Sequence, residues 1–464
     1  MFINRLAKLL FISTIGIYIF NMLFVWMNAH ADSYFYWMIS EYFRSGKYPF
    51  TSPFIYTKPT TISPPLYGIF FILTHSLPHA DVLLHALQLG LLGLSSYLLY
   101  WILLLHVKKP IAQIISCFFA IFPINLIYAT YVLTENPAQF FVTIWIFFVV
   151  LGLVKKRPFF ISVAVFIGAV AGLMKYNLMI YMILAGIFLF TYMKKIKIFD
   201  LLFPVLAGFI FIGWIFINHT ITGVWGLYDT KGTQLYNQFV AQTKIIPPEN
   251  DPSVIRMRSL LPIGTDIRVP YWDIQNFLIQ SLGGVWIDID KVLFDVAWAS
   301  VAGHPKEYIG NSLVNFARMH YDGYPHWTNL NSMGRTDKDG NDAVYCSWLS
   351  RVKMCDPILQ TQWSYPMWNT FITLEVSAFR FFAPFVFYLL FLPSLIFSIF
   401  SRDRLLRVYG VMYLVGVVPI AMTIHVDPRY IVPFYPLVML IVVLSMKRFI
   451  EFMVRYKKLF YDVK

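Results

Sequence analysis

The chain has 464 residues, of which 58% are hydrophobic and only 13% are charged. Soluble domains carry roughly 25% charged residues, so this composition excludes an ordinary soluble protein and indicates a membrane protein with membrane lipids around it. The formal net charge is +13. Because the Lys and Arg residues lie beside hydrophobic segments, where they determine topology, we expect no nucleic-acid partner.

Several uncharged apolar segments are long enough to be transmembrane helices, which need about 20 residues. The pattern predicts an all-α polytopic membrane protein with a membrane module over 1–217, an outer loop domain of mixed structure over 218–375 and a second membrane module over 376–464. The first segment lacks a small-residue cleavage site, so we expect it to be retained. The ten predicted spans are 9–28, 82–106, 111–133, 137–154, 158–174, 176–193, 198–217, 376–400, 405–424 and 430–446.

Basic residues flank these spans on one predicted side of the membrane. Cytoplasmic loops are rich in Lys and Arg, so we expect a cytoplasmic (inner) membrane protein with both termini inside. Residues 66–77 are apolar but too short to span, and they predict an interfacial helix ending at Pro78. The basic clusters are Arg5 and Lys8; Lys108 and Lys109; Lys155, Lys156 and Arg157; Lys194, Lys195 and Lys197; Arg402, Arg404 and Arg407; and Lys447, Arg448, Arg455, Lys457, Lys458 and Lys464.

The large outer loop, residues 218–375, is long enough for a small folded domain. Glycine, aromatic residues and repeated proline predict mostly extended or irregular chain from Gly223 to Pro262. Residues 291–320 predict two amphipathic helices, with Pro305 in the first turn of the second.

Two pairs in this loop have a possible chemical role. Cys346 and Cys355 are expected outside, where a disulfide between them and two free thiols both remain open. Asp288 and Asp290 form an Asp-x-Asp sequence, a form that binds metal and nucleotide diphosphate in soluble sugar transferases. Two acids at this spacing are common by chance, so we expect no metal site there.

Charged residues that do not suit a membrane span fall together on the outer side. Asp32, where the first span ends, is the first of them, and acids beside a span are rare unless they have a function. Each has a structural explanation as well: Glu135 could cap a helix, Lys175 could extend to the interface, and Arg429 could pair with Asp427. As a set they predict one site, formed by Asp32, Glu135, Lys175, Arg380, His425, Asp427 and Arg429.

Carboxylate and cations on the outer side suit group transfer from a lipid phosphate. A carboxylate can deprotonate an incoming hydroxyl or amine, and Lys or Arg binds phosphate. We expect donor phosphate or lipid contacts from Lys58, Lys175, Arg380 and Arg429, and substrate contacts from Tyr36, Tyr67, Glu135, His425, Asp427 and Tyr430.

These residues resemble the GT-C superfamily of integral-membrane glycosyltransferases, in the bacterial branch akin to the protein O-mannosyltransferases and the lipid A aminoarabinose transferase. The likeness is strongest in the first outer loop, where an Asp follows the first span, a turn with Ser-Gly follows and a Pro-Pro-Leu-Tyr element opens a helix. The matching residues are Asp32, Ser45-Gly46-Lys47-Tyr48-Pro49, Pro64-Pro65-Leu66-Tyr67, Thr134-Glu135, His304-Pro305-Lys306-Glu307-Tyr308 and Arg429-Tyr430-Ile431-Val432-Pro433-Phe434-Tyr435-Pro436.

The resemblance implies that Asp32 is the catalytic base and that a polyprenyl-phosphate sugar is the donor. It also implies inverting transfer to a lipid, glycan or protein acceptor at the periplasmic or exterior face. The chain departs from the family at Ser33, where an acid is common, and at Ser63, where a basic residue is common, so Lys58 would have to supply that phosphate contact. Because cations can neutralise the leaving phosphate, we expect no metal and no other cofactor.

Two other functions fit parts of the sequence. A lipid or glycan transporter or flippase also has many spans and intramembrane charges, but its ionisable groups are expected near the membrane midplane and not at span ends. A scaffold or sensor that binds through residues 218–375 leaves the outer charges unexplained.

Overall fold

The computed structural model consists of helices joined by turns and short irregular segments in the residues that it describes, which are 2–24, 31–46, 64–75, 80–192, 196–227, 230–321, 381–424 and 428–461. Among these residues no strand forms. Six described helices are long and apolar enough to cross a membrane: Ile3–Met22, Val82–Leu104, Glu135–Lys155, Ile198–Thr222, Phe381–Phe400 and Arg404–Thr423. The protein is therefore an integral multi-pass membrane protein, as its composition predicts. The count of ten spans stays a prediction.

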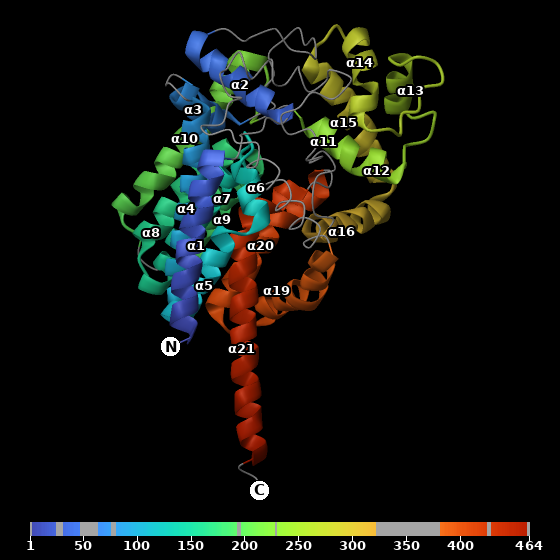
Figure 1. Cartoon of the computed structure of the whole chain (residues 1–464). Coiled ribbons are helices and arrows are strands. Elements are labelled where there is room, and N and C mark those ends of the chain that lie inside the picture. The colour runs from blue at the N-terminus through green and yellow to red at the C-terminus, as the bar shows by residue number, and fades with distance from the viewer. Residues whose placement is uncertain are drawn as a thin grey trace.

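The N-terminal part packs as a bundle of helices, with the first helix and its neighbours drawn in blue and green in Figure 1. One predicted span, 111–133, is instead two helices, because Pro123 starts a new helix after a turn. The helices are α1 (Phe2–Phe24), α2 (Ala31–Ser45), α3 (Pro65–His75), α4 (Ala80–Leu104), α5 (Lys109–Ala120), α6 (Pro123–Ala129), α7 (Glu135–Lys155), α8 (Pro158–Met174), η1 (Tyr176–Met179), α9 (Ile180–Tyr192), η2 (Ile198–Leu201) and α10 (Leu202–Thr222).

The prediction of mostly extended or irregular chain from Gly223 to Pro262 is confirmed for residues 223–227 and 244–251, which are not helical. It is wrong for residues 231–243 and 252–259, which form short helices. Proline begins helices here: Pro252 follows Asp251, whose carboxylate accepts a hydrogen bond of 2.8 Å from the Ser253 N–H and so caps the helix. The pair of helices expected over 291–320 is confirmed, and Pro305 is the first residue of the second. The elements are α11 (Lys231–Leu235), η3 (Tyr236–Val240), α12 (Ala241–Thr243), α13 (Pro252–Ser259), α14 (Tyr271–Ser281), α15 (Trp286–Gly303) and α16 (Pro305–Tyr321).

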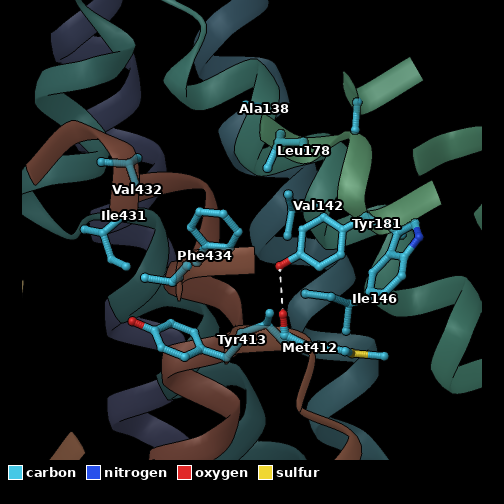
Figure 2. Close-up of a cluster of buried hydrophobic side chains, with 14 of the residues drawn as sticks. Ala138, Val142, Ile146, Leu178, Tyr181, Met412, Tyr413, Ile431, Val432 and Phe434 are labelled. Carbon is cyan, nitrogen blue, oxygen red and sulfur yellow. Dashed lines mark hydrogen bonds between the residues drawn. The ribbon is translucent and has the colours of Figure 1, made fainter. Parts of the chain in front are cut away.

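The C-terminal helices return to the bundle and complete its core. They are η5 (Val386–Phe391), α19 (Leu392–Phe400), α20 (Arg404–Thr423), η6 (Pro428–Phe434) and α21 (Tyr435–Tyr461). Figure 2 shows Tyr181, Met412 and Phe434 meeting from α9, α20 and η6, with the Tyr181 hydroxyl donating to the Met412 carbonyl at 3.3 Å. This packing fixes η6 against α7 and α9.

The basic clusters share one end of the bundle. Lys447 Nζ donates to the His106 carbonyl at 2.6 Å, and the Arg404 guanidinium lies 4.5 Å from the centre of the Tyr192 ring. The ends of α4 and α9 therefore meet the start of α20 and the middle of α21. Both termini lie at this end in Figure 1. The sorting of these clusters to one side agrees with the sequence analysis, while the assignment of that side to the cytoplasm stays a prediction.

Candidate functional site

Helix α2 brings Asp32 to the start of α7. Asp32 is the second residue of α2. The next residue, Ser33, is buried, and its hydroxyl donates to the Val132 carbonyl at 2.7 Å. Val132 lies three residues before Glu135, where α7 begins. This hydrogen bond ties the first turn of α2 to the chain that leads into α7.

Two buried tyrosines link α2, α3 and the same segment. The Tyr36 and Tyr67 rings meet edge to face with centroids 4.8 Å apart. The Tyr36 hydroxyl lies 3.4 Å from Thr134 Oγ1. Tyr67 is fully buried, and its hydroxyl has no hydrogen-bond partner among the described residues. Burial raises the pKa of Tyr67, and the nearby carboxylate of Glu135 raises it further, so this hydroxyl stays protonated and can donate.

Glu135 and Lys175 form a buried ion pair. Lys175 Nζ lies 2.8 Å from Glu135 Oε1, and the two side chains are only 10% and 2% exposed. Thr134, not Glu135, is at the N-cap position of α7, and no side chain caps that helix end. The structural explanations that Glu135 caps the helix and that Lys175 extends to the interface are therefore both wrong.

Lys175 reaches Glu135 because the chain turns there. It is the residue at which α8 ends, in an extended conformation, before η1 and α9 begin. The close packing of this hairpin requires Gly168, where an added Cβ would lie 2.5 Å from the Met182 backbone nitrogen. Small residues allow membrane helices to approach this closely.

Arg429 and Tyr430 on η6 complete the described cluster. Lys175 Nζ lies 4.7 Å from the centre of the Tyr430 ring, and the Arg429 guanidinium lies 5.1 Å from it. Arg429 Nη2 also donates to the Tyr430 hydroxyl at 3.3 Å. Arg429 is 7% exposed, so both cations are held in a low-dielectric environment where they attract an anion strongly.

Amide side chains beneath this cluster hold η6 to α7. Gln139 Nε2 donates to the Val432 carbonyl and to Asn125 Oδ1, both at 2.9 Å. Asn136 Nδ2 donates to the Asn125 carbonyl at 3.0 Å. The sequence suggests only a helix-capping role for Asn136, and the sequence analysis missed Asn125 and Gln139, although amide side chains within apolar segments were a usable signal.

The structure thus brings together six of the predicted site residues. These are Tyr36, Tyr67, Glu135, Lys175, Arg429 and Tyr430. Asp32 is placed by its backbone alone, in the first turn of α2 next to Ser33, and its side chain lies outside the described part of the structure. The predicted residues Lys58, Arg380, His425 and Asp427, and both Cys346 and Cys355, lie outside the described residues.

Two buried polar atoms of this cluster, Glu135 Oε2 and the Tyr67 hydroxyl, have no hydrogen-bond partner among the described residues. Glu135 Oε2 has no hydrogen bond among the described residues, although its residue is only 1% exposed. The hydroxyl of Tyr67, which is close enough to Glu135 for the carboxylate to raise its pKa, also has no hydrogen-bond partner among the described residues. Native proteins leave few such groups, so an acceptor and a donor that are both unused point to a polar ligand. Lys175 and Arg429 carry two positive charges beside the single carboxylate of Glu135, a count that covers the described side chains and not Asp32, so these two cations can attract an anion.

The Asp-x-Asp sequence has a structural role. Asp290 is 4% exposed and accepts hydrogen bonds from the N–H groups of Gly232 and Thr233 at 2.9 and 2.7 Å. Asp290, which lies on α15, thereby caps the start of α11. Asp288, also on α15, is exposed. Burial raises the pKa of Asp290, and these hydrogen bonds oppose that shift. No group of three potential metal ligands occurs among the described residues.

Comparison with known proteins gave likenesses among solved structures. No family model and no curated protein sequence matches the chain. The chain is similar to ArnT from Cupriavidus metallidurans in the apo state, with 12% identity, a TM-score of 0.37 and coverage of 94% of this chain and 77% of ArnT. It is similar to the same protein bound to undecaprenyl phosphate, with 12% identity, a TM-score of 0.36 and coverage of 95% and 78%. At this TM-score and identity the likeness does not establish an activity.

Proposed function

We propose that the protein is an integral-membrane glycosyltransferase that moves a sugar from a polyprenyl-phosphate donor to a lipid, glycan or protein acceptor. The reaction takes place at the end of the bundle opposite the basic clusters, which we assign to the periplasmic or exterior face. The observation that carries the proposal is the buried cluster of Lys175, Arg429 and Glu135, beside α2, whose second residue is Asp32.

The two cations of this cluster suit a lipid phosphate. Lysine has three N–H donors, and Lys175 gives one of them to Glu135 Oε1. Arginine binds phosphate through its planar fork. In our proposal Lys175 and Arg429 bind the donor phosphate, and Lys58 and Arg380 add contacts from neighbouring segments.

The unused atoms of Glu135 and Tyr67 suit a sugar. A carboxylate oxygen accepts and a phenol donates a hydrogen bond, so together they can bind hydroxyl groups of the donor sugar or the acceptor. In our proposal Tyr36 orients Tyr67 through their edge-to-face contact. His425, Asp427 and Tyr430 complete the substrate contacts from the chain around η6.

The proposed step is a single displacement. The acceptor oxygen or nitrogen attacks the anomeric carbon while the bond from that carbon to the phosphate oxygen breaks, and the electron pair of that bond stays on the phosphate. Asp32 takes the proton of the acceptor as general base. The cations stabilise the charge that develops on the leaving phosphate. No metal is needed in this scheme.

The test of the base is Asp32→Asn, which keeps the size of the side chain and removes its basicity. We expect the rate of sugar transfer in lipid vesicles to fall at least about a hundredfold, the usual contribution of a general base, with little change in donor binding. Glu41→Gln is the matched control, because Glu41 lies on the same helix and pairs with Arg44 at its exposed end. Transfer by Asp32→Asn within a few-fold of the control level contradicts the assignment.

The test of the metal-free scheme is chelation. We expect EDTA to leave the transfer rate unchanged, because Lys175 and Arg429 supply the positive charge that a metal ion otherwise provides. Loss of transfer in EDTA, with recovery when a divalent ion is added back, contradicts this scheme while leaving the role of Asp32 open to the first test.

A further inference from the structure

The last helix extends past the rest of the molecule. Helix α21 runs from Tyr435 to Tyr461, and Figure 1 shows its red C-terminal half continuing beyond the ends of the other helices. The bundle ends near Arg448, which pairs with Asp403 before the start of α20. The thirteen residues that follow in the helix extend about 20 Å at 1.5 Å per residue. We call residues 446–461 the tail helix.

The tail helix has an apolar face and a charged face. Positions 446, 449, 450, 453, 456 and 460 carry Met, Phe, Ile, Met, Tyr and Phe, a spacing that puts them on one side of a helix. Of these, Phe449 is 63%, Ile450 58% and Met453 49% exposed. The opposite side carries Lys447, Arg448, Glu451, Arg455 and Lys458, whereas position 457, a lysine, falls among the apolar positions, four residues after Met453. The exposed Phe452 and Val454 flank the charged side. A row of exposed apolar side chains in water is unfavourable, so this face needs a cover.

We propose that the tail helix lies in the headgroup layer of the adjacent membrane leaflet and binds its anionic lipids. The charge balance argues for this partner: Arg455, Lys457 and Lys458 follow the paired residues Lys447 and Arg448, and Glu451 is the only acid of the tail helix. Basic residues directly beyond a transmembrane helix are attracted to anionic lipid headgroups, and an amphipathic helix places its apolar face at the acyl boundary.

A second copy of the chain is a poorer partner for this face. The apolar row covers only about two heptads, whereas a coiled coil needs at least three or four. The membrane surface is already present where the tail helix begins. The helix is straight in Figure 1, and the proposal implies that it bends between Arg448, which Asp403 holds in place, and Met453 when it meets anionic lipid.

The experiment uses the full chain with Cys117→Ala, Cys346→Ser and Cys355→Ser, reconstituted in nanodiscs. An environment-sensitive fluorophore is attached at Met453→Cys on the apolar face or at Glu451→Cys on the charged face. The nanodiscs contain phosphatidylcholine alone or with added phosphatidylglycerol. With phosphatidylglycerol we expect the label at 453 to shift to the blue and to lose most of its quenching by iodide. High salt should reverse both effects, and the label at 451 should stay quenched.

Charge reversal supplies the matched control. The double variant Arg455→Glu/Lys458→Glu should abolish the effect of phosphatidylglycerol, and Lys155→Glu/Arg402→Glu, which reverses two exposed charges at the same end of the bundle, should retain it. Equal quenching at 453 in both lipid mixtures overturns the proposal. Protection of the label at 453 from iodide in both lipid mixtures also overturns it. In that case a short distance between spin labels on two copies would identify a second chain as the partner.

Discussion

Lys175 and Glu135 lie 40 residues apart in the sequence and 2.8 Å apart in the structure. Each charge is buried and depends on the other, because an isolated charge in a low-dielectric environment is strongly disfavoured. The pair thus has two separable effects: it keeps the α7 and α8 ends together, and it presents an ammonium group beside Tyr430. A purely structural pair would have only the first effect.

Single replacement of either partner separates these effects. We expect Lys175→Met and Glu135→Gln each to lower the free energy of unfolding by about 3–5 kcal/mol, because each leaves a buried charge without its partner. The double variant should regain most of that stability but not the transfer activity. Chemical unfolding in detergent and a transfer assay measure the two quantities.

The double-mutant cycle decides the question of coupling. If the stability losses of the two single variants simply add in the double variant, the side chains are not coupled and the ion pair is not the cause of the losses. If the double variant recovers transfer along with stability, Lys175 has only the structural effect and does not bind the donor phosphate.

At the scale of elements, the α8–η1–α9 hairpin decides where Lys175 lies. Its chain direction changes at Lys175 itself, and its two arms touch at Gly168. On the other side of the site, η6 is held by the Gln139 side chain through the Val432 carbonyl. Lys175 lies at the break between α8 and η1, and Arg429 lies on the 3-10 helix η6. Both described cations of the site therefore come from places where the α-helices are interrupted.

Gly168→Ala tests the position of this hairpin. The added methyl group would overlap the backbone of Met182, so the arms must move apart, and we expect a loss of about 1–3 kcal/mol in the free energy of unfolding. Transfer should fall because Lys175 moves with the hairpin. Unfolding in detergent and the transfer rate are the measurements.

Gly186→Ala in α9 is the matched control, since an added Cβ there meets nothing within 4 Å. We expect it to be neutral or slightly stabilising, because Ala favours a helix over Gly. Equal effects of the two variants would contradict the proposed role of close packing at Gly168.

At the scale of the whole molecule, the protein has two unlike ends. One end collects the basic clusters and both termini, and the other carries the site and helices α11–α15. Helix α16 runs along α20, from Met422 at its end to Tyr413 in its middle. Positive residues determine orientation during insertion. We therefore predict that the end with the basic clusters lies in the cytoplasm and that the end with the site lies outside.

Cysteine labelling in intact cells tests this topology. In a chain with Cys117→Ala, Cys346→Ser and Cys355→Ser, a membrane-impermeant thiol reagent should label Ile263→Cys, which is fully exposed in the structure, because we place it outside. It should not label Arg402→Cys until the membrane is permeabilised. Labelling of Arg402→Cys in intact cells, with Ile263→Cys protected, would reverse the orientation and place the site on the cytoplasmic side.

The sequence by itself determined the class of the protein, many of its helices and the common side of its basic clusters. These properties depend on local composition, because length and hydropathy decide whether a segment spans a membrane and nearby Lys or Arg decides its side. The same local signals failed at Pro123 and Pro252, which start helices where the sequence predicts a continuous span and irregular chain, although they succeeded at Pro305.

Only the tertiary structure decided which charges form a site and which are structural. Asp290 caps α11, Lys175 pairs with Glu135, and Arg429 meets Lys175 across the Tyr430 ring from more than 250 positions away. Sequence patterns identify such residues as unusual but do not identify their partners. The partner of a buried charge is chosen by the packing of distant helices, because a charge removed from water is stable only where the fold supplies an opposite charge or a donor.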